Sequence, residues 1–470
     1  MIRKLIFSLS FCFIVVNYAV SQNVVLRGNA SEYVGAKLSF LTFADQITYT
    51  EKELCSCQVN ENGDFSCSLN VNETTYVFLH LGIYEAFIFV EPGKEYQILL
   101  PEKQEKTMAD KLNPYFTPTQ YHLGIENSSE NELNYQLAFF DEIYSKMFES
   151  TSYAIYSKNP NLDVNAEISR VDSIFSDYDN KYFKDYKKYK YASYRQLAYN
   201  EKSKSISNTY YLNNEILYSN PAYMGLFNQV YKEYLQYFGR TESGKKIYID
   251  IGKYKSITLL KETLGQDSIL TNDTLKELVI LKCLHDEFYN DLLSRSAMIT
   301  VIDSLAIQTK IEEHKLIAAN IRDKVSKLMV GYAPPNFQLY DKDSNLVSLD
   351  TFKGKYVYLN FCTTVSYACI KELEMLRSFY DNHKDHFEIV IICMDESLAQ
   401  MKRFVERKRY PYTFLYYGNQ PEVFKDYDIR AFPTYYFINK KGELVLSPAP
   451  SPDQKAEVAI FKILKSNGDI

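Results

Sequence analysis

The sequence predicts a multidomain α+β protein with an N-terminal β-sandwich, a central all-helical domain and a C-terminal α/β domain. Three observations lead to this prediction. Residues 22–105 form short alternating apolar and polar runs between Gly, Asn and Asp turns, and residues 125–330 place apolar side chains at helical spacing. Residues 331–470 contain continuous apolar runs followed by helical patterns, as in a sheet covered on both faces. The length of 470 residues suits about three domains.

Residues 1–21 have the pattern of a secretory signal peptide. A basic start precedes an apolar run from Leu5 to Val16, and Ala19–Ser21 is a small-residue cleavage site. Phe11 before Cys12 is too large for a lipoprotein box, so we do not expect a lipid anchor. No other apolar run is long enough to span a bilayer. We therefore expect a soluble, exported protein, with a bacterial periplasm as its compartment.

Charge and composition restrict the partners. The net charge is −6, and removal of the first 21 residues with Arg3 and Lys4 leaves 51 basic against 59 acidic residues. An acidic chain of this kind is not expected to bind nucleic acid or an anionic membrane. Residues 239–246 (GRTESGKK) approach a phosphate loop, but Lys246 occupies the position of the required hydroxyl residue. We expect a polar turn there, and no nucleotide, cofactor or metal.

The N-terminal domain is predicted from its strands. Each run ends at a turn residue and carries β-branched or aromatic side chains, which is typical of a sandwich. The expected strands are Asn23–Arg27, Ala36–Phe43, Cys55–Asn60, Phe65–Val71, Thr75–Leu81, Ala86–Val90 and Tyr96–Leu100. A loop with Pro101, Pro114 and Pro118 then interrupts the pattern.

Three cysteines flank the turn Glu61–Gly63. A three-residue loop with a left-handed glycine places Cys57 opposite Cys67 on the two strands of a hairpin. In an oxidising compartment this pair can close. We predict a disulfide between Cys57 and Cys67, with Cys55 as the possible substitute for Cys57.

The central region is predicted to be helical and to carry no chemistry of its own. One apolar face recurs at helical spacing, and a second face is formed by Tyr178, Tyr182, Tyr186 and Tyr189. Thr274 and Glu277 form a capping-box pattern that predicts a helix through Leu293. We expect this domain to hold the outer domains or to present a partner surface. The residues of the apolar face are Leu133, Leu137, Phe140, Tyr144 and Met147.

The candidate site lies in residues 355–374 (KYVYLNFCTTVSYACIKELE). Tyr356–Phe361 is a buried strand by its apolar and aromatic run, and a helix follows with Ser366 as its N-cap. Cys369 then falls in the first helical turn, where the positive end of the helix dipole favours a thiolate. We expect the pKa of Cys369 to be lowered, with Ser366 donating a hydrogen bond to its thiolate.

This stretch resembles the active-site segment of the thioredoxin-like disulfide reductases of the TlpA/ResA type, an AhpC/TSA-related family with the pattern L-N-F-W-A-T-W-C-x-x-C-x-x-E. Cys362 and Val365 stand in place of the two tryptophans, and Ser366 stands in place of the first, attacking cysteine. The motif is therefore S-x-x-C, and the attacking thiol is missing. The matching residues are Leu359, Asn360, Phe361, Thr364, Cys369 and Glu372.

The resemblance extends over about residues 331–450 and implies a thioredoxin-like fold for residues 331–470. Gly331–Leu339, Val347–Gly354, Phe387–Glu396 and Ile429–Leu444 match the family's entry hairpin, short helix and later strands. In the family the residue matching Pro433 is a cis-proline beside the active site, and its neighbouring backbone pairs with a bound chain. We therefore predict a cis bond between Phe432 and Pro433.

Two functional interpretations are left open. In the first, Cys369 takes part in thiol-disulfide exchange with Ser366, Glu372 and Pro433 around it, and the partners are other exported proteins or a membrane thiol donor. In the second, the domain is a redox-inactive binding or scaffolding module. A third, minor interpretation is a one-cysteine peroxidase, because S-x-x-C is similar to the T-x-x-C of peroxiredoxins. An exposed Cys369 sulfur favours the redox interpretation, and a sealed one favours the scaffold.

Cys362 and Cys393 each have a structural interpretation. Cys362 ends the central strand, where it either fills space or resolves a mixed disulfide at Cys369, and we favour the first role. Cys393 lies within an apolar run and is interpreted as a small buried hydrophobic residue.

Overall fold

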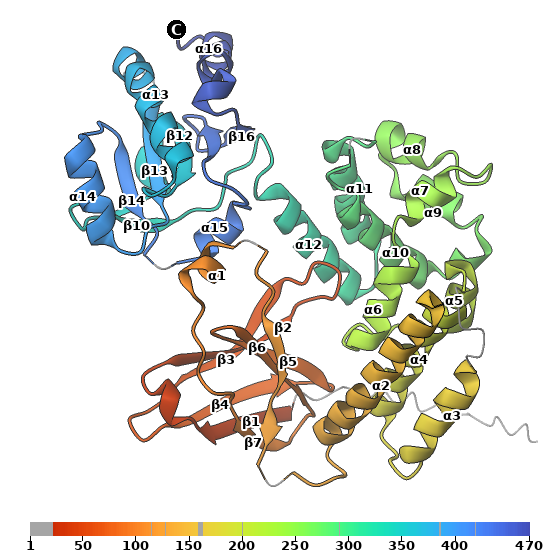
Figure 1. Cartoon of the computed structure of the whole chain (residues 1–470). Helices are drawn as coiled ribbons and strands as arrows, with labels where there is room; N and C mark the ends of the chain where they lie inside the picture. The colour runs from red at the N-terminus through yellow and green to blue at the C-terminus, as the bar shows by residue number, and fades with distance from the viewer. Residues whose placement is uncertain are drawn as a thin grey trace, which may run out of the picture.

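The computed structural model describes residues 22–470 except residues 114, 127, 158–162, 200, 291, 385–386 and 419. The predicted signal peptide lies outside the described residues. Figure 1 shows β-sheets near the N-terminus in red and orange, helices in yellow and green, and an α/β domain in blue. The predicted fold class is confirmed. Among the described residues, no helix combines the length and the apolar character needed to cross a bilayer.

The N-terminal region contains two sheets, with strand orders β4-β1-β7-β9 and β3-β2-β5-β6-β8. Their inner faces share one apolar core, because buried side chains alternate along strands such as β4. The elements are β1 (Gln22–Asn29), β2 (Lys37–Phe43), β3 (Glu51–Gln58), β4 (Asp64–Val71), β5 (Thr75–Leu81), β6 (Tyr84–Val90), β7 (Glu95–Leu99), α1 (Met108–Leu112), β8 (Thr119–His122) and β9 (Gly124–Ile125).

Two strands were not predicted. The segment interpreted as a proline-containing loop contains β8 and β9, which add an edge to each sheet: β8 pairs in parallel with β6, and β9 antiparallel with β7. Their residues are largely exposed, so they lack the alternation that identifies a half-buried strand.

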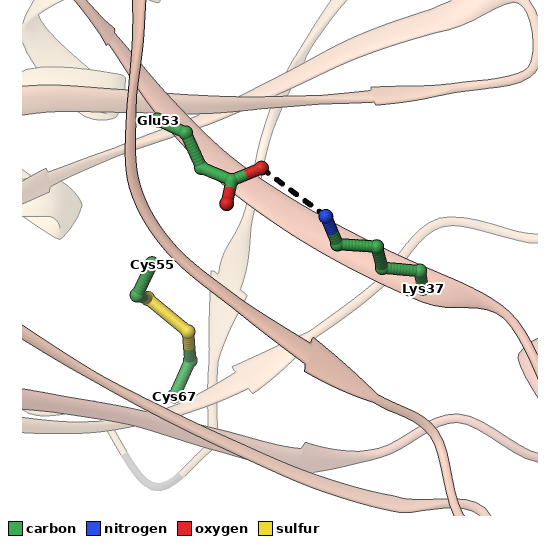
Figure 2. Close-up of a disulfide and its surroundings, with 4 residues drawn as sticks. All are labelled: Lys37, Glu53, Cys55 and Cys67. Carbon is green, nitrogen blue, oxygen red and sulfur yellow. Dashed lines mark hydrogen bonds and ion pairs between the residues drawn. A yellow bond between two sulfur atoms is a disulfide. The ribbon is translucent and has the colours of Figure 1, made fainter.

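The predicted pairing of Cys57 with Cys67 is wrong. The structure joins Cys67 to Cys55, the substitute, with the two Cα atoms 6.2 Å apart (Figure 2), and Cys57 is a free, partly buried thiol. The turn itself forms as expected, since Gly63 is left-handed at φ +87°. Beyond the turn, however, β3 and β4 separate into different sheets, where each is an edge strand. The disulfide therefore connects the two sheets, and hairpin register does not decide the pair.

The central region is helical, as predicted, and its apolar face at Leu133, Leu137, Phe140, Tyr144 and Met147 is buried. Its elements are α2 (Leu133–Tyr156), α3 (Val164–Ile174), α4 (Lys181–Tyr199), α5 (Ser203–Tyr210), α6 (Pro221–Val230), α7 (Tyr234–Gly239), α8 (Ile247–Ile249), a π-helical turn (Asp250–Tyr254), α9 (Ile257–Leu264), α10 (Asp273–Asp286), α11 (Arg295–Gln308) and α12 (Glu312–Ser326).

The predicted capping box of α10 is wrong. Asn272 caps the helix by accepting a hydrogen bond from Leu275 N, and the helix ends at Asp286. Glu277 is instead buried, where it accepts a hydrogen bond from Thr309 Oγ1 at 2.6 Å and lies 2.8 Å from His314 Nδ1. These contacts hold α12 against α10.

The C-terminal domain is a seven-stranded sheet in the order β11-β10-β14-β13-β12-β15-β16. All residues of β12 are buried, because strands pair on both its edges and helices cover the sheet. Cys362 is its last residue, as expected. The elements are β10 (Gln338–Asp341), β11 (Leu346–Ser348), β12 (Tyr356–Cys362), α13 (Tyr367–His383), β13 (Phe387–Cys393), α14 (Leu398–Lys408), β14 (Thr413–Tyr416), α15 (Glu422–Asp426), β15 (Thr434–Ile438), β16 (Leu444–Ala449) and α16 (Ala456–Ser466).

A buried carboxylate joins the β domain to α12. Asp45 accepts hydrogen bonds from Thr48 N at 2.6 Å and from Asn320 Nδ2 at 2.8 Å. Lys324, one helical turn beyond Asn320, donates to the Thr48 carbonyl at 2.7 Å. The loop between β2 and β3 is therefore fixed to one face of α12.

The thioredoxin-like domain contacts both other domains. Lys425 of α15 pairs with Glu51 of β3 at 3.1 Å, and Asp426 pairs with Lys327 after α12 at 2.8 Å. These lysines are exposed, so each pair contributes little to stability, about 0–1 kcal/mol. Their adjacent positions nevertheless place α15 between the β domain and α12.

The connection from α12 to the sheet is also hydrogen bonded. Gly331 N donates to Leu444 O and Leu444 N donates to Tyr332 O, both at 2.8 Å. Ser447 Oγ donates to Leu328 O at 2.6 Å. The linker therefore runs along β16 and is bonded to it.

We predict that Cys55→Ala lowers the free energy of unfolding of the β domain by about 3 kcal/mol, because the unfolded chain loses a short closed loop. Urea unfolding followed by circular dichroism measures the change. Cys57→Ala is the matched control and is expected to change it by less than about 1 kcal/mol, since this thiol is free and only partly buried. Equal losses in both variants, or peptide mapping that links Cys57, would contradict the assignment.

Candidate functional site

The site residues meet where β12 ends and α13 begins. Ser366 is the N-cap of α13, as predicted, and its Oγ accepts a hydrogen bond from Cys369 N at 3.4 Å. Cys369 lies in the first turn with no exposed surface. The helix start is therefore built as the sequence indicates, but the sulfur points into the core.

The expected lowering of the Cys369 pKa is wrong. A hydrogen bond with the Cys362 thiol and burial raise the pKa of Cys369 far above its usual value. Contacts with Thr363 backbone and Ser366 favour the thiolate, but they are smaller effects. Because the thiolate is the reactive form, Cys369 is held as an unreactive thiol in this structure.

Three thiols gather beneath the helix start. Cys362 contacts Cys369, and its sulfur lies 3.7 Å from the sulfur of Cys393. All three side chains are fully buried. Cys362 and Cys393 are the last residues of neighbouring parallel strands and pair in register. From the sequence, Cys393 was interpreted only as a core residue. The pattern that could have indicated the cluster is that a cysteine ends each of two buried strands.

Glu372 and Tyr435 form a buried polar pair beside the thiols. Tyr435 OH donates to Glu372 Oε2 at 2.7 Å, and the Glu372 residue is 8% exposed. Burial raises the pKa of Glu372, while the tyrosine hydrogen bond opposes the rise. The bond between Phe432 and Pro433 is cis, which confirms the prediction.

A second buried carboxylate was not predicted. Asp395, two residues after β13, accepts hydrogen bonds from Thr363 Oγ1 at 3.0 Å and from Thr364 N at 2.9 Å. It thereby holds the turn that connects β12 to α13. Asn360 is also fully buried, and its side-chain amide makes no hydrogen bond with the described residues.

A cleft of about 1300 Å³ opens beside this site, between all three domains. Pro433, Thr434 and Glu372 line one wall, while the loop at Thr48–Glu51 and α12 line others. Cys362, Cys369 and Ser366 are not part of its lining. The structure therefore brings the five predicted site residues into one region but separates them: the proline segment and Glu372 face the cleft, and the thiols lie in the core.

We predict that Glu372→Gln raises the melting temperature at pH 8 and has little effect at pH 4. A carboxyl with a raised pKa destabilises the fold once it ionises, so this cost appears as the pH rises through 4.5, the ordinary value. The amide removes the charge and still accepts the Tyr435 hydrogen bond. Thermal unfolding across this pH range measures the difference.

Glu374→Gln is the control, because its expected change in melting temperature at pH 8 has the opposite sign. Lys408 and Tyr410 hold the pKa of Glu374 below its usual value, so its ionised form stabilises the fold above pH 4.5. This variant should melt lower than wild type at pH 8. A lower melting temperature for Glu372→Gln at pH 8 would show that ionised Glu372 stabilises the fold and would refute the prediction.

Comparisons with known proteins identify the C-terminal domain. Residues 330–447 match the AhpC/TSA family. The thiol-disulfide oxidoreductase ResA of Bacillus thuringiensis subsp. konkukian is 32% identical over 124 residues, which are 26% of this chain and 70% of that protein. ResA of Bacillus subtilis is 32% identical over 117 residues, which are 24% of this chain and 64% of that protein.

Solved structures are also similar to a part of the chain. The thioredoxin domain of a thiol-disulfide oxidoreductase from Bacteroides vulgatus is 25% identical and covers 29% of this chain and 99% of its own, with a TM-score of 0.27. A thiol:disulfide interchange protein from Bacteroides sp. is 27% identical and covers 29% and 91%, with a TM-score of 0.27. On the sequence relationship to ResA, the chain belongs through its C-terminal domain to the AhpC/TSA family of thioredoxin-like proteins, as a relative of the ResA thiol-disulfide oxidoreductases.

Proposed function

We propose that the C-terminal domain is a polypeptide-binding module that holds an extended segment of a partner against Pro433, without thiol-disulfide exchange of its own. The observation that carries this proposal is the separation of the thiols from the cleft. Cys369 has no exposed surface, whereas Pro433 and Thr434 line a cleft of about 1300 Å³. A partner can therefore reach the binding segment but not the sulfur.

The chemistry of Ser366 supports the same proposal. In the family pattern this position carries the attacking cysteine, and a serine hydroxyl has no disulfide chemistry. The remaining thiol, Cys369, has a raised pKa and is sealed, so it supplies no thiolate to replace the attacker. A one-cysteine peroxidase needs the same exposed thiolate and is disfavoured for the same reason.

Exposed apolar side chains flank the helix start. Val365 is 70% exposed and Tyr367 is 83% exposed, on either side of Ser366. Exposed aliphatic and aromatic side chains next to a polar cap suit contact with a partner chain. From the signal-peptide pattern we also propose that this module works in the periplasm. Its proposed partners are other exported proteins, and we propose that it binds no nucleotide or nucleic acid.

Thiol-disulfide exchange through Cys369 is the second candidate. The contact between the Cys362 and Cys369 thiols favours it, because a resolving thiol must lie within reach of the reacting one. Access to Cys369 would then require the start of α13 to move away from the sheet.

The two candidates are separated by testing reduction and binding in the same protein. The purified protein should not reduce insulin above the background of dithiothreitol, and Cys369→Ser should leave its binding to an array of unstructured peptides unchanged. Pro433→Ala should weaken that binding at least tenfold, because it alters the segment against which the partner lies.

Pro421→Ala, at the start of α15, is the matched control for loss of a proline and should bind as wild type. Circular dichroism confirms that each variant is folded. Insulin reduction that disappears in Cys369→Ser would reject the binding-only proposal in favour of exchange. Peptide binding unaffected by Pro433→Ala would reject the assigned segment.

A further inference from the structure

The three buried thiols are arranged as a chain with Cys362 in the middle. Its sulfur contacts Cys369 on one side and lies 3.7 Å from the Cys393 sulfur on the other. The polypeptide-binding proposal uses none of these groups. Because Cys362 lies between the other two cysteines, it can form a disulfide with either of them.

The backbone favours one of the two pairings. Cys362 and Cys393 are in register on adjacent parallel strands, which places their Cα atoms about 4.8 Å apart. This separation lies within the range of about 4.4–6.8 Å found for disulfides. The strands are paired along their whole length, so both residues are held in position. The two sulfurs lie 3.7 Å apart before any bond forms.

Hydrogen bonds just beyond the pair fix both backbones. Met394 N donates to the Cys362 carbonyl at 2.9 Å, and Tyr417 N donates to the Cys393 carbonyl at 3.1 Å. Cys369 instead lies on α13, whose first turn is attached through the Ser366 cap. The strand register therefore supports a bond between Cys362 and Cys393, and the competing bond to Cys369 is decided by the experiment below.

We propose that Cys362 and Cys393 are a redox-sensitive pair that forms a reversible disulfide between β12 and β13. Two thiols lose two protons and two electrons and form one S–S bond. Both thiols are fully buried with raised pKa values, so the oxidant is a small molecule and not a protein. A small disulfide accepts the two hydrogens and is cleaved to two thiols, a diazene such as diamide accepts them and becomes a hydrazine, and a dithiol reductant reverses the reaction. This inference concerns the internal state of the sheet and does not depend on the proposed binding function.

The disulfide changes the surroundings of Cys369. Cys362 is then bonded to Cys393 and no longer provides the thiol hydrogen bond, which is the largest cause of the raised Cys369 pKa. The helix start and Ser366 continue to favour the thiolate. Cys369 has no exposed surface in this arrangement, so the change affects its pKa and not its access to a partner.

The test is oxidation of the folded full chain with diamide, which takes up the two hydrogens as a small oxidant that can enter protein interiors. Peptic digestion and mass spectrometry should find the Cys362 and Cys393 peptides linked, with a loss of about 2 Da that dithiothreitol reverses.

Three variants make the outcome decisive. Cys393→Ala, and Cys393→Val as a bulkier replacement that keeps the core filled, should abolish the link. Cys369→Ala should retain the link. Cys283→Ala, which removes a buried thiol in α10, is the matched control and should behave as wild type. A link between Cys362 and Cys369, or no link while circular dichroism shows a folded protein, would overturn the proposal.

Discussion

The position of the cleft depends on the buried carboxylate of Asp45. It orders the loop between β2 and β3 by accepting hydrogen bonds from Ile47 N and Thr48 N, and it attaches that loop to α12 through Asn320. A buried carboxylate is costly unless its oxygens are paired, so these contacts are mutually dependent. Without them the loop at Thr48 would keep fewer bonds to α12, chiefly the one from Lys324, and one wall of the cleft next to Pro433 would be held less firmly.

The thioredoxin-like domain relies on tyrosine where many proteins use tryptophan. The chain has 42 tyrosines and no tryptophan. In the central strands the rings of Tyr358 and Tyr435 stack with centroids 4.9 Å apart, and Tyr358 OH donates to the Pro450 carbonyl at 2.6 Å. Tyr427 OH donates to the Pro335 carbonyl at 2.6 Å. Each ring therefore fills the core and also fixes a distant loop, including the loops around the candidate site.

The features predicted correctly are those that depend on a short stretch of sequence. The strand Tyr356–Phe361, the Ser366 cap and the cis bond at Pro433 all follow from short segments or from the family resemblance, and all are present. The edge strands β8 and β9 were missed because an edge strand with exposed residues has no hydrophobic period. Local reasoning also fails for Glu277, whose spacing from Thr274 suggests a cap while tertiary packing buries it under α12.

The cysteines show most clearly what the sequence could not predict. The partner of Cys67 is decided by the divergence of β3 and β4 into two sheets, and the neighbour of Cys362 is decided by strand order. Both are long-range facts that spacing along the chain does not contain. The same holds for the sealing of Cys369: the helix start favours a thiolate, but the packing of α13 on the sheet creates the Cys362 contact and the burial that together raise the pKa.

The hydrogen-bonded linker after α12 has a mechanical consequence. A hinge normally consists of a few residues whose backbone is free to change its torsion angles. Here Gly331 and Tyr332 are bonded to Leu444 on β16, and Ser447 is bonded to Leu328. The residues from Leu328 to Tyr332 therefore move with the sheet, and a swing of the thioredoxin-like domain away from α12 must either break these bonds or bend the chain between Ser326 and Leu328. The length of backbone that can act as a hinge is short, which restricts how far the cleft can open or close.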